Sequence, residues 1–382
     1  MSKLLTKILL LLLAATFFSC SQENADEKEP STTEKTIIVF MPFSDNLYSD
    51  FLSNISAMKK AIVQNNGMNN TRLVVFIAKD KQNSSLIDIK YNKGVCSQDT
   101  LEKFSTPLYL TNEGRATILN KVKQYAPASK YAMIVGSHGK GWLPKPQNGM
   151  RKATRYFGGL SKGYQIDISE FAESIVAAGM KMQFILFDDC YLSCMEVAYD
   201  LKDATDYIIA STSEIMHYGM PYNVIYKYLM SQEPNYEAVC EGFYKFYSED
   251  SNPYGTIGVT NCKYVDEMVN VMKEINATHT FDMNMMDKVQ DLDGATFSPT
   301  IFFDFGDYVK ALCANDNTAL EKFNNVMQRL VPYKAATEEI WSGTKNRPTK
   351  INSFSGMAIS DPSTNTEVIE TKENTGWWIS TH

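Results

Sequence analysis

The sequence has few of the residues that would place it in several common protein classes. Its four histidines and seven cysteines are scattered over 382 residues, and the cysteines show neither disulfide-framework nor zinc-site spacing. Cys190 and Cys194 are four residues apart, but no second pair of ligands stands near them. Basic clusters are absent and the formal charge is −7, which argues against nucleic acid as a partner. The chain also shows no internal repeat.

Long apolar runs are equally scarce, and the one near the N-terminus is too short for a comfortable membrane span. Two lysines precede this run, Ile8–Phe18, and Cys20 ends the segment before a polar, acidic stretch. The order predicts a bacterial lipoprotein signal peptide over residues 1–19, with Cys20 as the acylated first residue. Side chains before Cys20 are bulkier than usual at such a site, so simple secretion is the alternative. Residues 20–35 have the composition of a flexible acidic tether.

About 360 residues remain, and the full chain is 44% apolar, which suffices for one large domain with or without an appendage. Apolar strands alternate with amphipathic helices, and this order predicts an α/β fold with a mostly parallel central sheet and helices on both faces. The pattern weakens from about residue 280, so we expect a core over 36–280 and a smaller C-terminal subdomain over 281–382. Strands are expected near 36–40, 73–78, 131–135, 184–187, 207–210 and 256–259. We also expect an edge strand or hairpin arm near 86–91, an extended piece at 108–110, and helices near 47–62, 113–125, 167–178 and 265–275.

One stretch combines a buried strand, a turn and a helix around a cysteine. Phe184–Phe187 is a continuous apolar run, Asp188 and Asp189 end it, and Cys190 follows. Helical apolar spacing then begins at Leu192, so Cys190 is expected beside the unpaired N–H groups of a helix N-terminus, which favour thiolate over thiol. In open parallel sheets, ligands also bind beyond the carboxyl ends of the strands.

A second stretch places a histidine in the same way. The apolar run Tyr131–Val135 leads into Gly136, Ser137, His138 and Gly139, and the glycines let other backbone or a substrate come close. A free cysteine alone is commonly a small buried hydrophobe, and a single histidine is commonly structural. Two strand ends bearing Cys and His together indicate a cysteine-nucleophile site. His217, in the loop after the next strand, is the nearest competing histidine.

These motifs resemble the clostripain family of cysteine peptidases, within the wider caspase, gingipain and legumain group. The specific matches are His138–Gly139 after a strand and Phe187–Cys190 about fifty residues later. The resemblance covers nearly the whole mature chain. It extends over Ile37–Ile55, Met195–Tyr199, Ala210–Ser211 with Gly219, Pro221 and Tyr222, and more loosely over Phe303–Tyr308 and Ser355–Ile359.

The resemblance implies a caspase-like fold and a cysteine endopeptidase that cleaves peptide or protein substrates after Arg or Lys. Cys190 would attack the scissile carbonyl through a thioester intermediate, and His138 would protonate the leaving amine and then activate water. The N–H groups of Gly139 and Cys190 would stabilise the oxyanion. We expect a monomer, attached to a membrane through its N-terminal lipid or else secreted.

The same resemblance suggests which residues take the basic side chain of the substrate. Asp188 matches the family acid two residues before the nucleophile, and Asp189 lies beside it, although strand-end carboxylates also commonly cap the next helix. The position of a second family acid is occupied by Tyr218, which can hydrogen-bond a cation but contributes no charge. Glu214 could substitute for it. A strict arginine preference is therefore left open.

Residues 143–165 lack apolar periodicity, and a loop this long is usually functional or disordered. The resemblance implies that the proenzyme cuts itself here after a basic residue, at Arg151 or Lys152. Clostripain depends on calcium, but no spacing in this sequence specifies a calcium site. We therefore expect no required cofactor, and calcium only by analogy.

Two other functions fit parts of the sequence. A surface lipoprotein of this fold could bind peptides or glycans without catalysis, but that function leaves the paired His and Cys motifs unexplained. The same site could also hydrolyse amide bonds of small molecules. Covalent labelling of Cys190 that depends on His138 separates an enzyme from a binding protein, and a peptide-library profile separates a protease from an amidase.

Overall fold

A nine-stranded sheet organises the chain, in the order β13-β11-β10-β9-β5-β1-β2-β3-β4. Five strands, β1, β2, β5, β9 and β10, are parallel, and antiparallel strands continue the sheet at both edges. Parallel strands end at one edge of the sheet, so β5 and β9 deliver His138 and Cys190 to neighbouring positions. The strands are β1 Thr33–Met41, β2 Thr71–Ala78, β3 Ser84–Asn92, β4 Val95–Phe104, β5 Ala128–Gly136, β9 Met182–Asp188, β10 Tyr207–Ala210, β11 Thr256–Asn261 and β13 Tyr333–Ala336.

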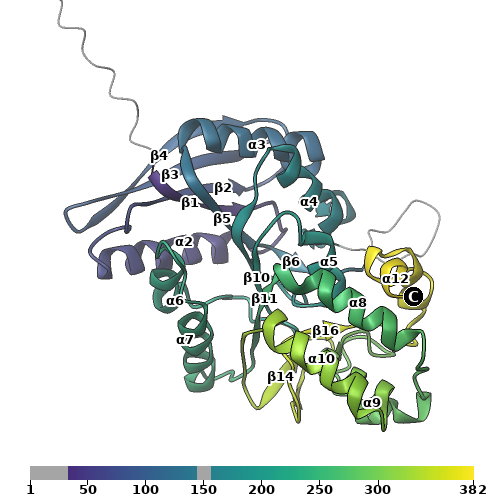
Figure 1. Ribbon diagram of the computed structural model, residues 1–382. Helices are drawn as coiled ribbons and strands as arrows, with labels where there is room; N and C mark the ends of the chain where they lie inside the picture. The colour runs from purple at the N-terminus through teal and green to yellow at the C-terminus, as the bar shows by residue number, and fades with distance from the viewer. Residues whose placement is uncertain (1–32, 144–155) are drawn as a thin grey trace, which may run out of the picture. The chain divides into compact units, whose positions relative to one another are not determined.

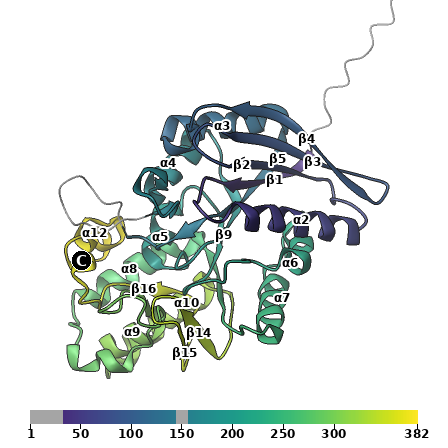
Figure 2. The same ribbon diagram turned by 180° about the vertical axis from the view of Figure 1, so that it is seen from behind.

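The computed structural model describes residues 33–143 and 156–382 (Figures 1 and 2). Residues Thr33–His382 form one compact unit. The expected signal peptide, the lipidation site Cys20, the tether up to residue 32, and the cleavage positions Arg151 and Lys152 lie outside the described residues. No helix within the described ranges is long and apolar enough to cross a membrane.

Helices cover both faces of the sheet, as the sequence predicts. Each face buries its own apolar cluster, because strands covered on both sides carry continuous apolar runs such as Phe184–Phe187. One face is covered by α2 Tyr48–Gln64, α6 Tyr222–Leu229 and α7 Tyr236–Glu249, which lie together in Figure 1. The other face is covered by α3 Asn112–Tyr125, α4 Ile168–Ala177, α5 Met195–Leu201, α8 Val265–Asn276, α9 Phe305–Cys313, α10 Asn317–Leu330 and α12 Gly376–Thr381.

The residues after 280 gather beyond β11, far from the β4 edge, in both views (Figures 1 and 2). They pack into the same apolar cluster as α5 and α8, and β13 extends the central sheet itself. Small sheets are formed by β6 His138–Gly139, β7 Phe157–Gly158 and β8 Gln165–Ile166, by β12 Phe303–Asp304 and β16 Ala358–Ile359, and by β14 Glu339–Ser342 and β15 Arg347–Lys350; α11 spans Thr366–Ile369.

Local sequence signals account for most of the boundaries. Thr111 accepts a hydrogen bond from the N–H of Gly114 at the start of α3, and Asp304 accepts one from Asp307 at the start of α9. Gly179, at φ +64°, follows the last turn of α4, where the predicted helix ends. One expectation is wrong, because Leu108–Leu110 is a 3-10 turn. The strand predicted near 86–91 is a hairpin arm, since β3 pairs antiparallel with β4, a strand that was not predicted.

Candidate active site

His138 lies just past β5 and is held from outside its own strand. Its Nε2 lies 2.8 Å from the Oδ1 of Asn46, in the loop after β1. An amide oxygen accepts, so Nε2 carries the proton and Nδ1 is the basic nitrogen. Burial lowers the pKa of His138, and the charge of Asp45 opposes this. The imidazole is therefore neutral at pH 7 and able to take a proton.

Cys190 lies in the turn after β9, and its surroundings differ from the sequence prediction. The next helix, α5, begins only at Met195, so no helix N-terminus adjoins the sulfur. The backbone N–H of Ile215 instead donates to Sγ at 3.4 Å. Burial raises the pKa of the Cys190 thiol to about 12, with Glu214 and nearby aspartates adding to the effect. The expected helix N-terminus beside the sulfur is therefore wrong, and burial favours the thiol over the thiolate.

The two strand ends are fastened directly to each other. Asp189 is fully buried and accepts hydrogen bonds from the N–H of Ser137 and from its hydroxyl at 3.1 Å. A Cβ at Gly139 would lie 2.5 Å from the carbonyl oxygen of Cys190, so only glycine allows this approach. The structure thus brings the His138 and Cys190 turns together. It also gives Asp189 a different task from the predicted substrate contact.

Tyr191, immediately after Cys190, adopts a left-handed backbone conformation with φ +65°. This conformation is uncommon for a bulky side chain and persists only where its surroundings impose it. The Tyr191 N–H donates to the carbonyl of Ser213 at 3.1 Å, and its ring stacks on Phe302 with centroids 4.9 Å apart. Its hydroxyl donates to Glu214 at 3.0 Å. The cysteine turn is therefore supported by the loop after β10 and by a C-terminal segment.

Asp188 lies at the end of β9 and is almost completely buried. Its carboxylate accepts hydrogen bonds from the N–H of Met220 at 2.8 Å, Tyr222 Oη at 2.9 Å and Asn54 Nδ2 at 3.2 Å. Burial raises its pKa to about 7, which the hydrogen bonds from Tyr222 and Met220 partly oppose. A Cβ at Gly219 would lie 2.4 Å from Oδ1, so the loop after β10 covers this carboxylate closely.

The other predicted pocket residues lie on this loop and are engaged by other elements. Glu214 accepts hydrogen bonds from Tyr191, from Thr296 Oγ1 at 2.6 Å and from the N–H of Gly343 at 2.9 Å. Tyr218 donates its hydroxyl to Asp250 Oδ1 at 3.0 Å. Glu214 therefore joins the loop to the C-terminal segments, whereas Tyr218 joins it to the end of α7.

His217, the nearest competing histidine, has different surroundings from His138. This side chain is 73% exposed, and its Nδ1 lies 3.1 Å from Asp50 Oδ1 at the start of α2. Asn46 and Asp50, like Asp250, were missed by the sequence reasoning. A signal for Asn46 and the adjacent Asp45 existed, because both follow β1 at the same carboxyl edge as His138 and Cys190.

Within residues 33–143 and 156–382, no three His, Cys, Asp or Glu side chains are grouped so that they could hold an ion. The arrangement of a neutral imidazole, a half-buried thiol and a buried carboxylate at adjacent strand ends fits nucleophilic acyl transfer. A mostly parallel α/β sheet bearing Cys and His in this way defines the class of cysteine peptidases with a caspase-like fold.

The sequence profile described as the clostripain family matches residues 39–356. The chain therefore belongs to the clostripain family of cysteine peptidases, as its motifs predict. No curated protein sequence matches it.

Solved structures agree with the family and the fold. A secreted C11 cysteine protease from Bacteroides thetaiotaomicron is 44% identical, with a TM-score of 0.85 over 92% of this chain and 100% of that chain. A clostripain from the same species, in complex with the peptide inhibitor BTN-VLTK-AOMK, is 51% identical over 59% of this chain and 99% of that chain, with a TM-score of 0.57. An inactive zymogen C11 protease from Parabacteroides distasonis is 25% identical, with a TM-score of 0.78 over 92% of this chain and 99% of that chain.

Proposed function

We propose that this cysteine peptidase is an endopeptidase that cleaves after Lys or Arg with a Cys190–His138 dyad. The observation that carries the proposal is the direct fastening of the two turns, through Asp189 to Ser137 and through Gly139 against Cys190. Catalytic groups must be held within a fraction of an ångström of a productive geometry, and this fastening restrains both of them.

The proposed reaction starts from the neutral pair. His138 takes the thiol proton as the Cys190 sulfur bonds to the scissile carbonyl carbon, and the N–H groups of Gly139 and Cys190 stabilise the oxyanion. The C–N bond then breaks, and His138 gives its proton to the leaving amine. Water attacks the thioester while giving a proton to His138. The C–S bond breaks, and that proton returns to the sulfur.

A preference for basic side chains rests on two supports. Asp188 lies two residues before the nucleophile, in a setting where a cation would favour its charged form. The similar Bacteroides clostripain binds an inhibitor whose peptide part, VLTK, ends in lysine. Substrates are therefore proposed to be peptides with Lys or Arg before the cleaved bond.

The proposal also includes activation of the zymogen by self-cleavage and attachment of the enzyme to a membrane. Self-cleavage within 143–165, at Arg151 or Lys152, would convert a zymogen to the active form, as the existence of a zymogen relative favours. Cys20 would carry the lipid that anchors the exported, monomeric enzyme to a bacterial membrane. Export itself is supported by the relative described as secreted. The proposed reaction requires no cofactor, and a role for calcium rests only on analogy with clostripain.

The intact mass of the purified mature protein, beside Cys190→Ala and His138→Ala, tests the proposal. We expect wild type as two fragments and both variants whole, together with labelling of wild type alone by a lysyl acyloxymethyl ketone. Failure of that reagent to label Cys190 in wild type, with no cleavage of Lys or Arg peptides, would overturn the proposal. Wild type that stays whole but is labelled would instead require activation by another protease.

A further inference from the structure

A connected series of contacts runs outward from the buried Asp188. Gly219 lies against the Asp188 carboxylate, and the Gly219 carbonyl accepts a hydrogen bond from Tyr247 Oη at 2.7 Å. The Tyr247 ring stacks on Tyr218 with centroids 5.9 Å apart, and Tyr218 donates to Asp250 at 3.0 Å. Asp250 immediately follows the last residue of α7 and is partly exposed. The series thus links a sealed carboxylate to an accessible one.

Asp188 alone is poorly suited to balance a substrate cation. It is covered by Gly219 and already accepts three hydrogen bonds. Burial raises its pKa to about 7, so near neutral pH it is ionised only in part. The other acids nearby are committed elsewhere, since Asp189 binds Ser137 and Glu214 binds three partners. A basic side chain entering this region therefore needs a further carboxylate.

Asp250 has a carboxylate oxygen that accepts no hydrogen bond from the described residues and can make such a contact. Within the described residues, its hydrogen bonds from Tyr218, from the N–H of Asn252 at 2.8 Å and from Ser251 Oγ at 3.4 Å all end on Oδ1. None ends on Oδ2. The Tyr218 hydroxyl uses its proton on Asp250, and the Asn252 side chain already hydrogen-bonds to its oxygen. A phenol oxygen has a second lone pair, which is still available to accept a hydrogen bond. Two acceptors, one of them charged, thus lie side by side.

We propose that Asp250 Oδ2 and the Tyr218 hydroxyl oxygen together bind the end of the substrate's basic side chain. This inference rests on the proposed endopeptidase function and names a specificity-determining residue for it. A guanidinium presents a fork of donors that reaches both acceptors, whereas a lysine ammonium is a compact point charge. Loss of the Asp250 charge therefore weakens arginine substrates more than lysine substrates.

A purely positional role makes a different prediction. If Asp250 only held the loop that carries Tyr218 and Ile215, its loss would disturb the Cys190 contact at 3.4 Å and slow every substrate equally. The ratio of rates between basic and neutral substrates would then stay constant. This ratio separates the two roles.

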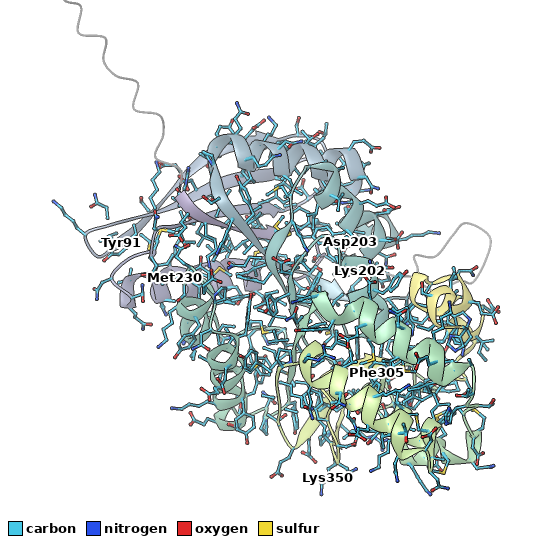
Figure 3. The ribbon with its side chains drawn as sticks, viewed as in Figure 1. Tyr91, Lys202, Asp203, Met230, Phe305 and Lys350 are labelled. Carbon is cyan, nitrogen blue, oxygen red and sulfur yellow. The ribbon has the colours of Figure 1, made fainter. Side chains whose placement is uncertain are left out.

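The experiment compares kcat/KM for three peptides that differ only in Arg, Lys or norleucine before the cleaved bond. The variants are Asp250→Asn and Tyr218→Phe. The matched control is Asp203→Asn, an exposed acid paired with Lys202 at 3.2 Å before β10 begins (Figure 3). Active enzyme is counted by covalent titration of Cys190, and thermal unfolding checks that each variant is folded.

We expect Asp250→Asn to lower kcat/KM for arginine by roughly 10- to 100-fold, as loss of a charge-assisted hydrogen bond does, and for lysine by less. Tyr218→Phe should lower the arginine rate several-fold, while norleucine and the Asp203→Asn control stay unchanged. An equal fall for all three peptides, or no fall, overturns the inference. If wild type cleaves no basic peptide and its Cys190 is not labelled, the proposed function fails first, and the inference falls with it.

Discussion

The side-chain oxygen of Asn46 lies 2.8 Å from Nε2 of His138, although the two residues are 92 positions apart in the chain. The contact joins the loop after β1 to the turn after β5, two strands that pair in parallel. It fixes both the ring orientation and the tautomer of the proposed catalytic base. In the proposed mechanism Asn46 is thus a positioning residue, and no carboxylate is needed for that task.

Replacing Asn46 with Ala should release the imidazole without removing it. We expect kcat to fall roughly 10- to 100-fold, part of the ~10²–10⁴ that positioned acid–base catalysis supplies, with KM nearly unchanged. Steady-state kinetics on titrated enzyme measures this. Asn83→Ala, which removes an exposed amide that donates to Asp80 in a turn, is the control. An Asn46→Ala enzyme with wild-type kcat would refute the positioning role.

Activity on basic substrates should depend on the ionisation of Asp188. Burial raises its pKa to about 7, so the carboxyl is neutral below that pH and charged above it. We expect kcat/KM for lysyl and arginyl peptides to rise as pH increases through about 7, and Asp188→Asn to abolish that rise. The pKa of His138 is lowered, so its own acid limb lies at lower pH and is common to all peptides. Identical pH profiles for basic and neutral peptides would contradict this assignment.

Gly139→Ala should damage the site through its contact with the cysteine turn. The added Cβ would lie 2.5 Å from the Cys190 carbonyl oxygen and 2.9 Å from the Asp189 Cβ, so the turns must separate. We expect at least a tenfold loss of kcat and a destabilisation of about 1–3 kcal/mol, typical of overpacking. Gly163→Ala, whose nearest neighbour is the flexible Lys81 ammonium at 3.4 Å, serves as the control. Equal behaviour of the two variants would disprove the close approach.

Stability should fall with rising pH because of a buried carboxyl in α5. Glu196 accepts a hydrogen bond from the Ser360 N–H at 2.9 Å, and burial raises its pKa to about 8. Between its usual 4.5 and about 8, the folded chain holds a proton that the unfolded chain releases. This group therefore removes up to about 1.4 kcal/mol of stability per pH unit as the pH rises through that window.

Glu196→Gln tests this linkage by removing the titrating group. We expect the Tm of the variant to drop less than that of wild type between pH 5 and pH 8, measured by thermal unfolding. The exposed Glu241→Gln is the control for removing one negative charge. Parallel Tm curves for wild type and Glu196→Gln would exclude the linkage.

Metal removal should leave the rate unaffected. The proposed chemistry moves a proton between Cys190 and His138 and needs no Lewis acid. We expect activity after dialysis against a chelator to equal the untreated rate, with added calcium giving no increase. If the chelator abolished activity and added calcium restored it, this enzyme would depend on calcium as clostripain does.

Much of the site was predictable because it depends on local patterns. Phe184–Phe187 and Tyr131–Val135 are continuous apolar runs, and polar, cysteine or glycine residues follow each at its carboxyl end. The strand ends that carry Cys190 and His138 could therefore be located from the sequence. The mostly parallel sheet with helices on both faces was predicted from the same alternation of strands and helices.

The remainder depends on contacts between distant segments. The helix was expected near Leu192, but the N–H groups of Tyr191 and Ser193 bind the carbonyls of Ser213 and Ser211, which holds this turn extended until Met195. The spacing of apolar residues along the sequence gives no indication of such tertiary hydrogen bonds. The same reason explains why the partners Asn46 and Asp250 were missed.

The ladder between β5 and β9 has a consequence for the mature enzyme. Residues 137–181 separate these strands in sequence, yet the strands pair in parallel from Tyr131 with Met182 to Gly136 with Asp188. Within this segment, His138 and Gly139 also pair with Gly158 and Phe157, across residues 144–155. A peptide-bond break within residues 144–155 would leave two polypeptides joined by these noncovalent pairings, with the histidine on one and the cysteine on the other.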